Sequence, residues 1–475
     1  MDRRPIAIAS GAFLVFCLAA LAMASSTDAM LGSAAGAFLS LAIDLNHGIF
    51  YRPLVDDTGI GGTRYFPLVF VLNAWLIRAG LSPVMAGRLI AVVSAVALIW
   101  AALRILEDLD VPRPWARALA PLTLCSSPGV IALITIRGDL LPAALDLWGV
   151  VFAIRVLRRD RAWDVGAAIA FFALAVLAKA TAAYAALAMA LALALNGRPR
   201  RALVLGAGTL LAAASLLVLA NAASDGRMME SMRACMFGGG LSNMLRAPMS
   251  TVYVLIRQDP LCSLLLILFF VSLMSLPWDG WKEPLTLQAL AALAMTVFLF
   301  ASPGVDVNHL LDFYVVTTLF VGYQIVRGRL FPALATRAIA VGVAFTMFAA
   351  YLDLRHSMLD GEISQRSAVR ALVREVRVDG KPIFTSDGFI PSAENERSYM
   401  LDNWMFQMLR GTDSRFDSAL QAKLAQRYFG AVVLQTDLDG MAALYGDNFL
   451  PSLASNYEVA GRFPPYVVFR LKPSR

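Results

Sequence analysis

Long apolar runs constrain the fold of this chain more than any other feature. Runs of about 17 or more residues recur before residue 352, and each is long enough to cross the ~30 Å hydrocarbon core of a bilayer. Charged residues make up only 16% of the chain, and the mean hydropathy is +0.65. A backbone in lipid must satisfy its own hydrogen bonds, which favours helices. The sequence therefore predicts an all-α, polytopic membrane protein.

The placement of basic residues predicts how the chain crosses the membrane. The formal net charge is +7, and the segment from residue 352 onward contains 15 basic and 15 acidic residues, so the surplus lies in the apolar part. Loops rich in Lys and Arg mark the cytoplasmic side of membrane proteins. We therefore expect a cytoplasmic N-terminus, about eleven transmembrane helices and an external C-terminal region.

The apolar runs also predict where the helices lie. The run from Ile6 to Ala24 is longer than a secretory signal core, although Ala22-Met23-Ala24 resembles a cleavage site, so we interpret it as a retained helix. The run from Pro67 to Ile77 is too short to span, and we expect it on the outer face within an external loop over residues 25–87. The other helices are expected at about 88–104, 117–135, 140–157, 202–221, 251–276, 285–301, 310–326 and 335–351, with two short helices within 165–195 that meet near Lys179.

The composition changes near residue 352, where charged residues become common. Helix-like and strand-like runs alternate from there on: Ser364–Val378, Lys381–Thr385, Ser414–Tyr428, Ala431–Gln435 and Pro465–Leu471. We therefore expect two domains, a transmembrane domain over residues 1–351 and a small external α/β domain over residues 352–475.

Polar residues gather in the segments that this topology places on the external face. They are Asp28, Asp44, His47, Asp56, Asp57, Arg64, Arg137, Asp139, Lys179, Asn308, His309 and Asp312. Ionisable groups at membrane depth are costly and usually pair with one another or serve a function. A carboxylate can take a proton from a hydroxyl or hold a metal, and Arg or Lys can neutralise a phosphate leaving group.

Each of these residues also has a structural explanation. The alternatives are helix capping for Asp28 and Asn308, solvated turns for Asp44, Asp56 and Asp57, a mutual ion pair for Arg137 and Asp139, and contact with lipid headgroups for Lys179. His47 and His309 are candidates for a shared metal site, although they lack ligand spacing. The four cysteines are scattered and form no metal motif. A divalent metal at the two histidines is one option, and the sequence does not identify the cofactor.

Several short motifs follow one another in a recognisable order. Asp28 stands at the outer end of the first helix, and an amphipathic stretch leads to Gly48-x-x-Tyr51-x-Pro53 and then to Tyr65-Phe66-Pro67-Leu68. Arg137-Gly138-Asp139 and Lys179 follow at the next outward turns. This order resembles the GT-C superfamily of integral-membrane glycosyltransferases, including its protein mannosyltransferase and aminoarabinose transferase branches. The chain departs from relatives at Asp28-Ala29, where they often have Asp-Glu, and at Phe66-Pro67, where they have Pro-Pro.

The resemblance implies a hexosyl or pentosyl transferase in a bacterial inner (plasma) membrane. Its donor would be a sugar on a polyprenyl phosphate, and its acceptor a glycan, lipid or protein reached from the external side; no nucleic acid is involved. Transfer would invert the anomeric centre, with an Asp as general base. The roles implied by position are Asp28, Asp44 and Asp139 as catalytic carboxylates, with Asp28 as the base and Asp44 as its rival; Arg64, Lys179 and Arg137 at the donor phosphate; and Tyr51, Tyr65, Asn308 and His309 at the substrate.

Two other functions fit a polytopic chain with an external domain. A transporter or flippase of lipid-linked glycans would place ionisable groups along a path through the middle of the membrane, whereas here they cluster at one face. A non-catalytic membrane scaffold would use the external domain to bind a partner. Both remain alternatives to the glycosyltransferase.

Overall fold

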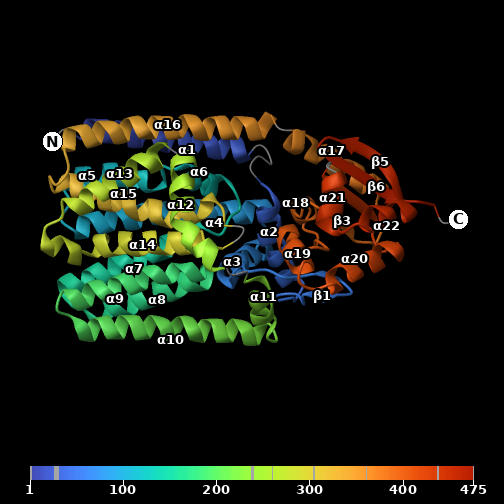
Figure 1. The fold of residues 1–475 in the computed structure, drawn as a ribbon, viewed down its shortest axis with the longest axis horizontal. Helices are drawn as coiled ribbons and strands as arrows, with labels where there is room; N and C mark the ends of the chain where they lie inside the picture. Colours follow the sequence, from blue (N-terminus) through green and yellow to red (C-terminus); the bar gives the residue numbers. More distant parts are fainter. Residues whose placement is uncertain are drawn as a thin grey trace.

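The chain forms a long helical bundle with a smaller α/β body at one end (Figure 1). The computed structural model describes residues 3–25, 31–236, 240–258, 260–302, 305–359, 361–435 and 438–473. The N-terminus lies at the end of the bundle opposite the C-terminal body (Figure 1). We call the end that meets the C-terminal body the site end.

Six helices among the described residues are long and apolar enough to cross a membrane. They are α1 (Arg4–Ser25), α4 (Pro83–Asp108), α7 (Leu140–Arg159), α10 (Pro199–Ala223), α15 (Leu311–Val326) with the short 3-10 helix η4 (Val307–Leu310) before it, and α16 (Pro332–Leu359). The chain is therefore an integral membrane protein by length and composition of its helices. Four shorter apolar helices lie beside them: α8 (Ala162–Ala178), α9 (Ala183–Leu195), α13 (Pro260–Met274) and α14 (Pro284–Leu299).

The single helix expected at 117–135 is instead a broken element. Helix α5 (Arg113–Leu119) continues as a 3-10 turn to Leu124, and α6 (Ser127–Ile134) then leaves at an angle of 74°. Pro128 stands in the first turn of α6, and the Ser126 hydroxyl accepts a hydrogen bond from the Gly129 amide, which starts a new helix. The six spans, this bent pair and the four shorter helices add up to the expected eleven only if every shorter helix also crosses.

The two short helices expected to meet at Lys179 are present. Helix α8 ends at Ala178, Lys179 has an extended backbone, and the 3-10 turn Ala180–Ala182 leads into α9. Two short apolar helices, α2 (Ser33–Asn46) and α3 (Pro67–Arg78), lie at the site end (Figure 1), and residues 35–44 of α2 are buried on all sides. At 12 residues, α3 is about 18 Å long and too short to span a bilayer.

Ion pairs tie the helices together at the end remote from the site. Arg155 pairs with Asp108 at 2.7 Å, Arg201 with Asp160 at 2.7 Å, and Arg329 with Glu283 at 3.1 Å. These arginines belong to the segments that the charge bias assigns to the cytoplasm.

The C-terminal body contains a four-stranded sheet in the order β3-β4-β6-β5. The strands are β3 (Ile383–Thr385), β4 (Ala431–Gln435), β5 (Tyr457–Phe463) and β6 (Tyr466–Leu471), with β3 parallel to β4 and the other pairs antiparallel. Alternate residues face opposite sides, as the two-residue period of a strand requires. Val433 packs toward α17 (Gly361–Val376), whereas Val432 packs toward α19–α22. The predicted strands at 381–385, 431–435 and 465–471 are confirmed.

Strand β5 was not expected from the sequence. Its residues form a strand because they pair with β6 in the folded protein, and the register of this pairing shifts between Val459 and Gly461. The remaining described helices are α11 (Arg227–Cys235), α12 (Leu241–Gln258), α18 (Phe389–Ala393), α19 (Asn403–Arg410), α20 (Arg415–Ala425), α21 (Leu438–Tyr445) and α22 (Phe449–Asn456).

The described segment from Leu31 to Ser82 joins the bundle to the C-terminal body. Its small hairpin, β1 (Val55–Asp56) and β2 (Gly59–Ile60), places Ile60 in the apolar core of the body. The Ile60 amide donates to the Tyr399 carbonyl at 2.8 Å, and the Leu401 amide donates back to Ile60 at 3.0 Å. Residues before 352 thus contribute to the core of the C-terminal body.

A second contact between the two parts is the close approach of α2 and α18. A Cβ built at Gly36 would lie 2.5 Å from backbone atoms of Gly388 and Phe389, and the hydroxyls of Ser40 and Ser392 are 2.8 Å apart. A third contact is buried and charged. Asp44 accepts from Arg52 at 2.6 Å and from Arg397 of the C-terminal body at 2.8 Å.

Gly36→Ala should weaken the docking of the C-terminal body. The added methyl meets backbone, which cannot rotate away, so we expect a loss of about 1–3 kcal/mol in unfolding free energy. Thermal unfolding of the detergent-solubilised protein measures it. Gly11→Ala is the control, because nothing lies within 4 Å of a Cβ at that position in α1. Equal melting temperatures for the two variants would contradict this contact.

Asp44→Ala should destabilise the protein strongly. The substitution leaves Arg52 buried without its carboxylate, which typically costs about 3–5 kcal/mol. The same thermal measurement tests it, with Asp57→Ala as control because that carboxylate is fully exposed and pairs only with Lys423 among the described residues. A variant with unchanged stability but no activity would instead assign Asp44 to catalysis.

Candidate functional site

Three segments that are far apart in the sequence meet around Asp139 at the site end. Asp139 immediately precedes α7, Lys179 lies between α8 and α9, and Asn308 lies in η4. The Lys179 ammonium is 2.9 Å from one carboxylate oxygen of Asp139, and the Asn308 amide donates to both oxygens at 3.1 Å. Lys179 is also 3.9 Å from Asp312. The structure thus brings together Asp139, Lys179, Asn308 and Asp312 from the predicted face.

Local backbone features place these groups. The extended conformation of Lys179 interrupts the apolar helix, so its ammonium stays at the end of the bundle. A Cβ at Gly138 would lie 2.7 Å from the Phe38 ring of α2, so a glycine is needed where the Asp139 loop meets this ring. The Tyr65 ring packs against the same Phe38, with centroids 4.2 Å apart. These contacts hold the chain around Phe38 and Tyr65 against the Asp139 segment.

Asp139 is an ionised group despite its burial. Its relative exposure is only 6%. Burial alone would raise the pKa of the carboxyl, but the charge of Lys179 with its hydrogen bond, together with His309 and Asn308, lowers that pKa below its usual value. Asp139 therefore carries a fixed negative charge at neutral pH.

Two arginines add positive charge beside this pair. Arg137 has a side chain that is 28% exposed and lies 3.6 Å from Asp306, a long contact that leaves it accessible. The guanidinium of Arg64 stands 5.1 Å from the centroid of the Trp404 ring. The charges of Lys179, Arg64 and Arg137 all act on the ring of His309.

Tyr65 belongs to the same cluster. Burial raises the pKa of its phenol, and the charges of Asp402, Arg64, Asp139 and Arg137 act on it. It therefore stays a neutral hydroxyl that can donate or accept a hydrogen bond.

The C-terminal body contributes residues that sequence reasoning missed. Asp402 starts α19, and its carboxylate accepts from the amides of Trp404 and Met405 at 2.9 and 3.1 Å. Burial raises the pKa of this carboxyl. Trp404 and Asp402 stand in a domain that sequence analysis treated as separate, so no local pattern pointed to the site.

Asp146 is a second residue that sequence reasoning missed. It lies about two helical turns after Asp139 on α7 and is 1% exposed. Neither of its carboxylate oxygens has a hydrogen-bond partner among the described residues, and the charges of Asp312 and Lys179 act on it. An acid inside an apolar run was the available signal, since such groups within a membrane usually have a function.

Other predicted residues have different surroundings. Both oxygens of Asp44 are bound by guanidinium groups at the contact with the C-terminal body. Tyr51 is 1% exposed, and its hydroxyl donates to the Tyr65 carbonyl at 2.8 Å, so it supports the Tyr65 segment from behind. Asp56 caps its own turn by accepting from the Thr58 and Gly59 amides. Asp28 lies outside the described residues.

The two histidines proposed for a metal do not share a visible ligand set. The His47 ring nitrogen lies 2.9 Å from the Ile43 carbonyl at the end of α2, whereas His309 is beside Asp139 and Lys179. Within the described part of the chain, no group of three or more His, Cys, Asp or Glu side chains is arranged to hold a metal ion.

Comparison with known proteins identifies the fold. No protein-family profile and no curated protein sequence matches the chain. Among solved structures, it is similar to ArnT from Cupriavidus metallidurans bound to undecaprenyl phosphate, with a TM-score of 0.66 and 13% identity over 98% of this chain and 99% of that chain.

Two further structures share the architecture. The oligosaccharyltransferase of Archaeoglobus fulgidus has a TM-score of 0.55 and 12% identity over 93% of this chain and 71% of its own. The arabinofuranosyltransferase AftD from Mycobacteria has a TM-score of 0.53 and 14% identity over 100% of this chain and 40% of its own. The chain therefore has the fold of the GT-C integral-membrane glycosyltransferases, as its motifs predicted.

Proposed function

We propose that this protein transfers a sugar from a polyprenyl-phosphate donor to an acceptor hydroxyl at the site end of the bundle, with inversion. The observation that carries the proposal is the buried Asp139–Lys179 pair with Asn308, set beside Arg64 and Arg137 at the end of an apolar bundle. The fold that this chain shares with ArnT, which was solved bound to undecaprenyl phosphate, supports a lipid-phosphate donor.

The cations suit the phosphate of such a donor. Lys179 is engaged by Asp139 and Asp312, so its charge is largely balanced within the protein. Arg137 meets Asp306 only at 3.6 Å with a side chain that is 28% exposed, and the Arg64 guanidinium stands over the Trp404 ring. We assign the phosphate mainly to these two arginines, whose planar donors fit phosphate oxygens. Lys179 would complete the positive field.

The base is assigned to Asp28 from its neighbours. The described chain resumes at Leu31, which packs in one apolar cluster with Ile136 and Ala178. Those two residues immediately precede Arg137 and Lys179. The described chain that follows Asp28 in the sequence therefore begins beside the cluster. The rival base, Asp44, has both oxygens bound by arginines, which suits a structural role.

The reaction follows from these roles. The acceptor oxygen forms a bond to the anomeric carbon as the bond from that carbon to the phosphate oxygen breaks. The electron pair leaves with the lipid phosphate, whose charge Arg64, Arg137 and Lys179 neutralise, and the acceptor proton passes to Asp28. Asp139, fixed as an anion, stabilises the positive charge that develops on the sugar ring. Tyr65, Asn308 and His309 line the same cluster and can orient sugar hydroxyls.

Asp139→Asn should lower transfer by about 10²–10⁴-fold, the range for losing one electrostatic or acid–base group. Because the pKa of Asp139 lies below its usual value, the wild-type residue stays ionised from pH 8 down to pH 5. The deficit of the variant should therefore be the same across that range. Transfer from a polyprenyl-phosphate sugar is measured in proteoliposomes, with Asp57→Asn as control.

Asp28→Asn should abolish transfer as well, while both variants still insert and fold. Asp28 accepts a proton at each turnover and must lose it again, whereas Asp139 stays ionised throughout. Full activity of both the Asp28 and the Asp139 variants would disprove the site.

Arg137→Ala and Arg64→Ala should weaken binding of undecaprenyl phosphate by about tenfold each, the usual effect of removing a charged hydrogen-bond donor. Titration of the purified protein with the lipid measures this binding. Arg78→Ala is the matched control, since this exposed arginine lies in the same external loop and donates to the Leu45 carbonyl. Equal affinity in all three variants would remove the arginines from the donor site.

A further inference from the structure

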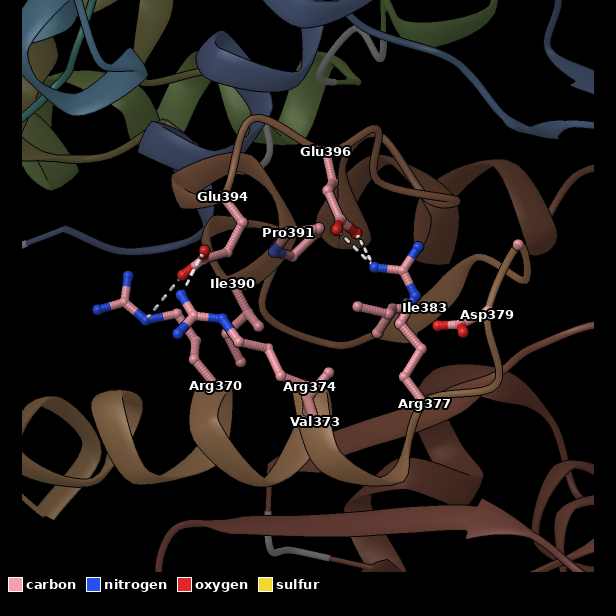
Figure 2. A pocket seen from close by; sticks show the side chains of 11 residues that line it. Arg370, Val373, Arg374, Arg377, Asp379, Ile383, Ile390, Pro391, Glu394 and Glu396 are labelled. Carbon is pink, nitrogen blue, oxygen red and sulfur yellow. Dashed lines mark hydrogen bonds and ion pairs between the residues drawn. The ribbon is translucent and has the colours of Figure 1, made fainter.

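A polar groove runs across the C-terminal body, away from the Asp139 cluster. Its first part is a cavity of about 330 Å³ between α17 and the loop after α18 (Figure 2). Its second part, of about 440 Å³, shares Arg377, Gly380 and Glu396 with the first, so the two cavities adjoin. Both lie in the size range of small-molecule sites, about 300–1,000 Å³. We call the two cavities together the α17 groove.

Paired charges line the first cavity. Figure 2 shows Arg370 and Arg374 directed at Glu394, and Arg377 directed at Glu396. The Arg374–Glu394 and Arg377–Glu396 contacts are both 2.5 Å, and Asp379 adds a third carboxylate to the same lining. Three guanidinium groups thus face three carboxylates, so this cavity has no excess of positive charge for an anion such as phosphate.

The lining still has hydrogen-bonding capacity. Arg374 uses one nitrogen on Glu394, and its side chain is 66% exposed. Arg377 uses Nη1 on Glu396 and Nε on the Lys381 carbonyl, out of the five N–H donors of a guanidinium. Each arginine–glutamate pair therefore presents a donor beside an acceptor. A sugar hydroxyl, which both donates and accepts, matches such a pair.

The second cavity suits a continuation of the same ligand. Its lining adds the Asn395 amide, the Lys381 side chain and the ring of Tyr428. Amide groups are among the polar groups that fix the orientation of a ligand, and aromatic side chains are common in the lining of small-molecule sites. Arg397 lines this cavity and pairs with Asp44, which connects the groove to the C-terminal half of α2.

The position of the groove decides which part of a substrate it can hold. The middle of helix α2 meets the Asp139 segment through Phe38, and Asp44 near the end of α2 pairs with Arg397 of the groove. A ligand in the groove therefore lies to one side of the Asp139 cluster, beyond the C-terminal end of α2.

We propose that the α17 groove binds distal residues of an extended, uncharged oligosaccharide that serves as the acceptor. This rests on the proposed function, because only a transferase needs an acceptor. The acceptor is then a glycan chain rather than a single lipid headgroup or a protein side chain.

The test is direct binding by the purified full-length protein in detergent. A microarray of neutral gluco-, manno- and arabino-oligosaccharides and of anionic oligogalacturonides selects a ligand, and calorimetry then measures its affinity. Arg374→Ala and Glu394→Gln should each weaken binding about tenfold, the effect of losing one charged hydrogen-bonding partner. Arg415→Ala is the matched control, because that arginine is 75% exposed and pairs with Asp413 on the same body, outside the groove.

The outcomes separate this inference from the proposed function. Binding of neutral oligosaccharides that falls only in the two groove variants supports it. Binding of anionic chains alone, equal binding in all variants, or no binding to the array overturns it. Binding of undecaprenyl phosphate to the wild-type protein is measured in parallel; failure there counts against the donor site and leaves the outcome for the groove unchanged.

Discussion

The ion pair between Asp139 and Lys179 is the interaction on which the proposed site depends. Both side chains lie at the end of an apolar bundle, where an isolated charge would be strongly disfavoured. Each keeps its charge because the other is 2.9 Å away and Asn308 completes the hydrogen bonds of the carboxylate. The pair is also what three separate chain segments share, so it joins the helices as well as supplying charge. Removing one partner would leave the other buried and unbalanced.

The same principle explains the join between the bundle and the C-terminal body. Asp44 is buried between Arg52 and Arg397. Its helix α2 also packs closely on α18, where Gly36 meets the backbone of Gly388 and Phe389. The segment from Leu31 to Ser82 therefore makes two contacts. Its far end, at Arg64 and Tyr65, approaches the Asp139 cluster, and its hairpin completes the core of the C-terminal body. The body in turn places Trp404 and Asp402 beside Arg64.

Much of the fold could be predicted from residue patterns. The lengths of the apolar runs located the long helices. The run at 67–77 was predicted to be too short to span, and it forms the 12-residue helix α3. The predicted pair of short helices that meet at Lys179 is present as α8 and α9. The bent pair α5–α6 was missed because only run length and charge were considered, whereas Ser126, Ser127 and Pro128 interrupt the apolar run and start a new helix. Strand β5 was missed because pairing with β6, rather than its own pattern, makes it a strand.

Sequence alone determined the class of the protein and the residue types at one face, because hydropathy and charge act through composition and spacing. It also named Asp139, Lys179 and Asn308, since charged or polar groups beside apolar runs are rare and costly. It did not determine which of those groups meet. Three features depend on contacts between segments up to hundreds of residues apart. They are the proximity of Lys179 to Asp139, the ion pairs of Asp44 with two arginines and the burial of Asp146. Such contacts are set by packing in three dimensions, which no local pattern records.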